Sequence, residues 1–111
     1  MDSILNSVKK FLGIGTDYKN FDVDIIMHIN TAFAVLTQMG VGPSNGFMIE
    51  DETSEWSEFY IENKMNTIKS YVYLKVKLLF DPPTSNALLE SANNMLREYE
   101  WRLYVECDNA N

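Results

Sequence analysis

Apolar residues recur at intervals of three and four along most of the chain, the spacing that places them on one face of an α-helix. A first such segment, residues 3–12, is short and ends at Gly13. Longer segments follow at 22–39, 63–80 and 86–105. The pattern therefore predicts one short helix and three long ones.

Side chains that can cap a helix N-terminus stand at the start of each predicted helix. They are Ser3; Asn20 or Asp22; Asn63 or Asn66; and Thr84 or Ser85. Gly13 and Gly40 suit the left-handed conformation that ends many helices. Pro82 prevents the helix of residues 63–80 from continuing.

The segment 70–83 is the most apolar part of the chain, and it fits two periodicities. Alternate residues form one apolar face of a strand: Val72, Leu74, Val76, Leu78 and Phe80. Helical spacing also gives one face: Met65, Ile68, Val72, Val76 and Leu79. A long strand here would lack a partner, because only residues 46–50 offer another, shorter extended segment. We therefore interpret 70–83 as helical as far as Phe80.

These elements predict an all-α fold, a small antiparallel helical bundle of three long helices with a short N-terminal helix and an irregular acidic insertion. In the second helix Ile26, Ile29, Phe33 and Leu36 are expected to face the core. The 111 residues are enough for a single domain, 1–111, with its core at about 20–105 and a flexible tail at 106–111.

No apolar run approaches the roughly 20 residues that cross a bilayer, and the N-terminus lacks the pattern of a secretory signal. The amphipathic segment 3–12 carries too few basic residues for a strong membrane anchor, so we expect it to dock on its own domain or on a neighbouring subunit. The single cysteine, Cys107, is interpreted as an unpaired surface thiol in a reducing cytosol.

The net charge of −7 arises from one window of the sequence. Within residues 50–62 stand six acids and no base: Glu50, Asp51, Glu52, Glu55, Glu58 and Glu62. The rest of the chain holds ten acids and nine bases, so it is close to neutral. Such a distribution argues against a general nucleic-acid binder, which needs a basic surface to displace counterions from phosphates.

Aromatic residues interrupt the acidic window, and two interpretations remain open. Trp56, Phe59 and Tyr60 either cover the core as a lid with an acidic outer face, or form an interaction patch fringed by charge. A basic ridge, Lys69, Tyr73 and Lys77, aligns four residues apart on the following helix. The ridge and the window could meet between subunits or inside one. The candidate interface residues are Glu50, Asp51, Glu52, Glu55, Trp56, Glu58, Phe59, Tyr60, Lys69, Tyr73 and Lys77.

Little in the chain points to catalysis. His28, the single histidine, lies four residues after Asp24, and such a pair is either catalytic or an ion pair on the helix surface. The turn at 40–45 (GVGPSN) lacks the lysine of a phosphate-binding loop, and no cluster has metal-ligand spacing. The sequence therefore predicts no enzyme, no cofactor and no metal site.

Four motifs of the chain are DIIMHIN at 24–30, LTQMGVGP at 36–43, KSYVYLKVKLLFDPP at 69–83 and YEWRL at 99–103. They resemble motifs of small proteins encoded by tailed phages and prophages of Gram-positive bacteria. The likeness covers about residues 22–104 and is to head–tail connector (adaptor) proteins. It rests on packing and turn motifs, so it transfers no functional residue to a particular position.

The resemblance implies a non-enzymatic, all-helical structural subunit of the virion. It implies a homo-oligomeric ring between the portal protein and the tail-completion or tail proteins, with the subunit present in the host bacterial cytoplasm during assembly. Whether the free subunit is a monomer stays open. The alternative function is a phage-encoded interaction module or regulator that binds a host protein through the acidic aromatic patch. Neither reading involves a membrane or a specific nucleic acid.

Overall fold

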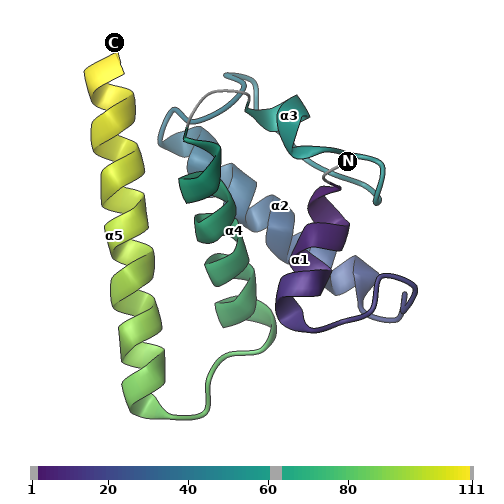
Figure 1. The fold of residues 1–111 in the computed structure, drawn as a ribbon. Helices are drawn as coiled ribbons and strands as arrows, with labels where there is room; N and C mark the ends of the chain where they lie inside the picture. Colours follow the sequence, from purple (N-terminus) through teal and green to yellow (C-terminus); the bar gives the residue numbers. More distant parts are fainter. Residues whose placement is uncertain (1–2, 61–63, 111) are drawn as a thin grey trace.

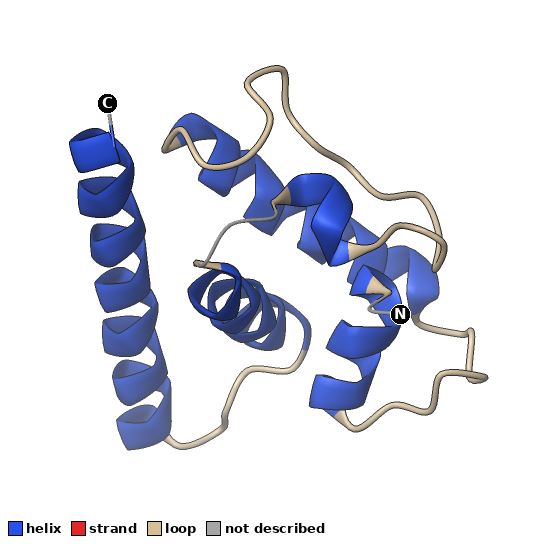
Figure 2. Ribbon diagram, turned by 45° about the horizontal axis from the view of Figure 1, so that its top comes forward, coloured by secondary structure: helices blue, strands red, loops and turns tan. Residues whose placement is uncertain are grey.

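The computed structural model describes residues 3–60 and 64–110, with side chains as far as residue 105. Its helices are α1 (Ile4–Leu12), α2 (Asp22–Gln38), α3 (Trp56–Phe59), α4 (Met65–Phe80) and α5 (Asn86–Ala110) (Figure 1). The described residues contain no strand (Figure 2), only an isolated antiparallel bridge between Ser3 and Glu55. The predicted all-α class is confirmed, and the ambiguous segment is helical through Phe80.

Helix α4 is the central element of the fold. It packs against α1, α2 and α5, while α1 also packs against α2. Helix α5 lies along one side of α4 (Figure 1), and α4 is its main packing partner. Much of the surface of α5 is consequently left open to solvent.

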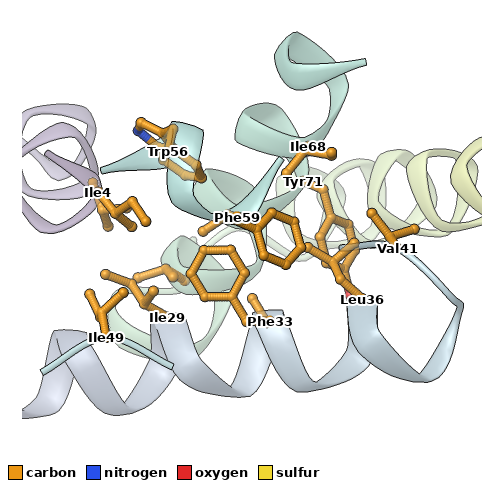
Figure 3. Close-up of a cluster of buried hydrophobic side chains, with 14 of the residues drawn as sticks. Ile4, Ile29, Phe33, Leu36, Val41, Ile49, Trp56, Phe59, Ile68 and Tyr71 are labelled. Carbon is orange, nitrogen blue, oxygen red and sulfur yellow. The ribbon is translucent and has the colours of Figure 1, made fainter. Parts of the chain in front are cut away.

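The core is built from α1, α2 and α4, with contributions from α5 and from the connection between α2 and α4 (Figure 3). Its buried apolar residues are Ile4, Leu5, Val8, Ile25, Ile29, Ala32, Phe33, Leu36, Val41, Ile49, Trp56, Phe59, Ile68, Tyr71, Val72, Val76, Leu96 and Leu103. The core thus reaches Ile4, well before the expected lower boundary near residue 20. The short N-terminal helix docks on its own domain, one of the two sites expected for it.

Two of the predicted N-caps are confirmed. Ser3 Oγ accepts a hydrogen bond from the Asn6 amide at 3.2 Å, and Ser85 Oγ accepts one from the Leu88 amide at 3.4 Å. At the other end of α1, Gly13 adopts the left-handed conformation with φ 81°. The limits of α1 therefore follow from local sequence signals.

The predicted caps of α2 and α4 are wrong. Phe21 occupies the cap position of α2 and makes no side-chain cap hydrogen bond. Lys64 occupies that of α4, which leaves Asn66 inside the helix, whereas Asn63 lies outside the described residues. Tertiary contacts and not local capping fix the start of α2, because Asp22 pairs with a lysine from α1.

That lysine, Lys9, has a relative exposure of 0 % and is the one buried charged side chain among the described residues. Its Nζ donates hydrogen bonds to the carbonyl oxygens of Thr16 at 3.2 Å and Tyr18 at 2.7 Å. Nζ also lies 2.8 Å from Asp22 Oδ1 as an ion pair. One ammonium group therefore fastens the loop between α1 and α2 and the first turn of α2.

Two details of the long helices differ from the prediction. Ile25, which was not among the residues expected to face the core, is fully buried in α2, whereas Ile26 packs against the core but is only partly buried. Helix α5 runs to Ala110, five residues beyond the predicted end at residue 105. Leu96 and Leu103 are the buried apolar residues of this helix.

A polar contact also joins α5 to α4. The buried Tyr71 hydroxyl donates a hydrogen bond to Glu100 Oε2 at 2.9 Å. Burial first, and then the Glu100 carboxylate, raise the pKa of Tyr71 well above its usual value of 10. Tyr71 therefore stays protonated and remains a donor throughout the neutral range.

Tyr71→Phe is expected to lower the free energy of unfolding by about 1.5–3 kcal/mol at pH 7, because a hydrogen bond to a carboxylate is lost. A raised folded-state pKa adds stability that is complete below the unfolded-state pKa near 10 and declines as pH rises above it. The advantage of wild type over Tyr71→Phe should therefore shrink above pH 10. Urea unfolding at pH 7 and pH 11 measures both effects, and a pH-independent difference would contradict them.

Candidate interaction surface

The acidic segment, defined as residues 50–59, is anchored to the core by its aromatic residues. Trp56 and Phe59 at its end are 2 % and 4 % exposed and point inward (Figure 3). The Phe33 ring lies 6.2 Å from that of Trp56 and 4.6 Å from that of Phe59. Trp56 Nε1 also donates a hydrogen bond to Ser7 Oγ at 3.2 Å. Of the two interpretations left open, the lid over the core matches this geometry.

Hydrogen bonds to α1 and within α3 hold the same segment. The Ile4 amide donates to the Ser54 carbonyl at 3.0 Å, which joins the segment to the start of α1. The Glu55 amide donates to Glu58 Oε2 at 2.8 Å, which stabilises the single turn of α3. The backbone beneath the acids is therefore fixed at several points.

Asn30 of α2 fixes the approach to the segment. Its side chain makes two hydrogen bonds with the backbone of Ile49, donating to the carbonyl at 3.0 Å and accepting from the amide at 2.8 Å. The Asn30 side chain thus bonds the backbone amide and carbonyl of Ile49, as a neighbouring strand would in a sheet. The short extended segment predicted at residues 46–50 is therefore held by a side chain and not by a sheet.

Asn30→Ala is expected to cost about 1–3 kcal/mol of stability, because the Ile49 amide and carbonyl lose their partners. Hydrogen exchange of residues 46–52 should accelerate more than that of α4. The control is Asn94→Ala, an exposed asparagine on α5. Equal stability losses in the two variants would contradict the assigned role of Asn30.

The carboxylates of the segment face solvent. Glu50, Asp51, Glu52 and Glu58 are exposed, and Glu55 is half-buried. The hydroxyl and amide of Thr53 donate to Asp51 Oδ1 and hold the pKa of Asp51 below its usual value. The segment therefore presents exposed carboxylates to solvent, and Glu52 Oε1 among them lies 3.9 Å from Lys19 Nζ as an ion pair.

The basic ridge meets the acidic segment inside the subunit. Lys69 Nζ lies 5.7 Å from the centroid of the Trp56 ring. The Tyr73 ring stacks on Phe11 at 5.0 Å and meets Trp56 edge-on at 5.9 Å. Further along, Lys77 pairs with Asp81 at 2.8 Å. Lys69 and Tyr73 are thus brought together with Trp56, whereas Lys77 is engaged at the end of α4.

Of the remaining candidate residues, the structure describes the surroundings of some and not of others. Tyr60 is half-buried and packs against the core. Glu62, in the acidic window, and the side chain of Cys107 lie outside the described residues. His28 lies with its ring centroid 6.4 Å from that of Phe80.

A groove along α2 was not predicted from the sequence. It has a volume of about 680 Å³, and we call it the α2 groove. Its lining residues are Val23, Ile26, Met27, Asn30, Thr31, Ala34, Thr37, Gly46, Phe47 and Met48. The available signal was that α2 carries apolar residues on more than its core-facing side.

Groups of three or more side chains able to hold a metal ion are absent from the part of the chain that the structure describes. Within the same residues no helix combines the length and apolar character needed to span a membrane.

Fold and surface together define a small all-helical protein with a rigid, acid-bearing loop. The family model described as "Phage connector protein" matches residues 4–110, and the chain belongs to this family of phage head–tail connectors. The predicted recognition is thereby confirmed, and with it a structural role in a bacteriophage. No significant match was found among curated proteins or among solved structures.

Proposed function

We propose that the chain is a subunit of a ring that assembles between portal and tail. It would contact the portal protein, the tail-completion or tail proteins, and copies of itself. It would be present in the host cytoplasm during assembly and afterwards in the virion. The observation that carries the proposal is that one subunit displays two different exposed surfaces. These are the exposed carboxylates of the acidic segment and the exposed apolar residues of α2 and α5.

A ring of identical subunits needs such a pair of surfaces. In a head-to-tail contact one face of each subunit must match a different face of its neighbour, and the ring closes if the rotation allows it. A further surface must remain for the portal or the tail. An outward array of carboxylates suits that role, because complementary charge speeds encounter and selects the partner. An acidic face toward a DNA passage would also repel phosphates.

The ring proposal is tested by mixing the purified full chain with its cognate portal and imaging the mixture by electron microscopy. Rings on the portal are expected. Absence of association at every salt concentration tested would refute the proposal. Gene order is an inexpensive second test, because a connector gene should lie between portal and capsid genes and tail genes.

Neutralising the carboxylates of the acidic segment should slow docking. The triple change Glu50→Gln, Asp51→Asn and Glu52→Gln is expected to lower the association rate about tenfold or more at low salt, with a smaller effect at high salt. A matched control, Asp17→Asn, Glu90→Gln and Glu98→Gln, changes the net charge equally elsewhere on the surface. Equal effects of the two triple variants in surface plasmon resonance would contradict a role for residues 50–52.

The structure favours this function over a regulator that binds a host protein through an acidic aromatic patch. Such a patch would need Trp56 and Phe59 at the surface, and both are buried. The candidate interface is therefore proposed to consist of the outward acids, with these two aromatic residues as their support.

A further inference from the structure

The α2 groove exposes apolar side chains that none of the other described residues covers. Val23, Met27 and Met48 are 78 %, 55 % and 73 % exposed. Val23 and Met27 come from the first turns of α2, and Met48 comes from the segment that Asn30 fastens beside the helix. Clustered apolar exposure of this kind marks an interaction site in a small protein.

The polar groups that line the groove are largely engaged already. Thr31 Oγ1 donates to the Met27 carbonyl at 3.0 Å, and Thr37 Oγ1 donates to the Phe33 carbonyl at 2.9 Å. Both bonds turn the hydroxyls back onto their own helix. The groove therefore offers few hydrogen bonds to an occupant and suits apolar and aromatic side chains.

Acidic residues flank the segments that line the groove. Residues 20–63, which include all of α2 and the acidic segment, contain neither lysine nor arginine. Asp24 stands exposed in the first turn of α2, whereas Asp22 is paired with Lys9, and the acidic segment begins two residues after Met48. A basic group at the edge of an occupant would be attracted to this rim.

Helix α5 carries a stripe with the matching properties. Arg97, Trp101 and Tyr104 follow at intervals of four and three, so they share one face of the helix. Trp101 and Tyr104 are 66 % and 55 % exposed, while Leu96 and Leu103 turn toward α4. Arginine, tryptophan and tyrosine dominate the binding energy of many protein interfaces.

The charge of Arg97 is not neutralised by a carboxylate among the described residues. Its guanidinium donates to Asn94 Oδ1 at 2.5 Å, and among the described residues it forms no ion pair with a carboxylate. The only other arginine of the chain, Arg102, is already paired with Glu98 at 2.7 Å. Glu90 shares the face of the stripe but lies two turns before Arg97.

We propose that the Arg97–Trp101–Tyr104 stripe of one copy docks into the α2 groove of a second copy. The aromatic rings would cover Met27 and Met48, and Arg97 would face the acidic rim. This inference rests on the proposed ring and names the contact that repeats around it. The occupant fits in length, because residues 23–37 of α2 span ~21 Å and residues 97–104 of α5 span ~10 Å.

Both surfaces are free in one subunit at the same time. Helix α5 packs on α4, and α2 packs on α4 through its core-facing side, so α4 lies between the two (Figure 1). Each copy can therefore give its stripe to one neighbour and receive another neighbour's stripe in its groove, which is a head-to-tail contact.

Cysteine cross-linking tests the contact in the full chain. In a Cys107→Ser background, one variant carries Met48→Cys and a second carries Tyr104→Cys. Each alone, and both mixed, are assembled on the cognate portal and oxidised. A disulfide-linked dimer is expected in the mixture and in neither variant alone. A single chain carrying both cysteines should give a ladder of linked oligomers.

A second measurement does not depend on disulfide geometry. Trp101→Ala should raise the subunit concentration needed for half-maximal ring formation about thirtyfold, as for a hot-spot residue. The control is Leu88→Ala, which is 63 % exposed on another face of α5 and should assemble like wild type. Circular dichroism should show both variants folded.

The outcomes separate this inference from the proposed function. Wild-type rings without the mixed disulfide, or rings of Trp101→Ala at the wild-type concentration, overturn the docking of α5 in the groove and leave the connector ring standing. Absence of both rings and portal association in the wild type overturns the proposed function itself.

Discussion

Lys9→Met is expected to lower the free energy of unfolding by about 3–5 kcal/mol, the cost of removing one partner from a buried ion pair. Methionine fills nearly the same space, so the loss arises from the missing ammonium. The Thr16 and Tyr18 carbonyls lose their donor, and Asp22, whose side chain is 16 % exposed, keeps a charge without a counterion.

This loss is large for a small domain, whose total stability is about 5–15 kcal/mol. It should be accompanied by a local change, because Lys9 joins α1 to the loop of residues 13–21 and to the start of α2. Hydrogen exchange in the first turn of α2 is expected to accelerate in the variant.

The matched control for Lys9→Met is Lys10→Met. Lys10 is exposed, and its substitution removes the same charge. Its effect should stay below about 0.5 kcal/mol, as for most surface substitutions. Urea unfolding followed by circular dichroism measures both variants. Similar midpoints would show that the buried lysine contributes little. The double change Lys9→Met with Asp22→Asn should recover part of the loss, because it removes the unpaired carboxylate.

The helices could be predicted because periodicity and termination signals agree in most of them. Gly13 acts through its left-handed backbone conformation and Ser85 through a side-chain cap, and both signals depend on the residue type and its neighbours in the sequence. The strand alternative for residues 70–83 was resolved by the lack of a pairing partner, and α4 is helical there. Local signals failed for the start of α2, where Lys9 acts from a different helix.

The role of Lys9 could not be predicted, because a lysine on an amphipathic helix is usually exposed. Only the tertiary fold shows that three oxygen atoms surround its ammonium group. The same holds for Asn30, whose two hydrogen bonds reach a residue nineteen positions away. Spacing within a helix carries no information about such contacts.

The candidate interface could be predicted only in part for a related reason. Charge is visible in the sequence, and the exposed acids of residues 50–52 lie where the pattern placed them, on an outer face. Whether an aromatic residue beside these acids faces solvent depends on the apolar core beneath it. The Phe33 ring packs against both Trp56 and Phe59, and Gly42 leaves room for the Phe59 ring, so both aromatic residues are buried.

Gly42→Ala is expected to cause the second large loss of stability, because Gly42 lies against the Phe59 ring. Gly42 has φ +87°, a conformation that costs an L-residue about 1–2 kcal/mol. A Cβ atom there would also clash with Cε1 of the Phe59 ring. Overpacking of this kind costs a further 1–3 kcal/mol or so, which gives a total loss of about 2–5 kcal/mol.

Gly46→Ala separates the two contributions of Gly42→Ala. Gly46 has φ +94°, but a Cβ atom there meets nothing within 4 Å, so only the backbone cost of about 1–2 kcal/mol should appear. Adding Phe59→Leu to Gly42→Ala should cost less than the sum of the single changes, because leucine leaves room for the methyl group. Thermal unfolding of the four variants measures the coupling. Equal losses at Gly42 and Gly46, with strictly additive effects at Phe59, would show that the ring does not need the space that Gly42 leaves. The lid that carries the acids would then be held by its other contacts alone.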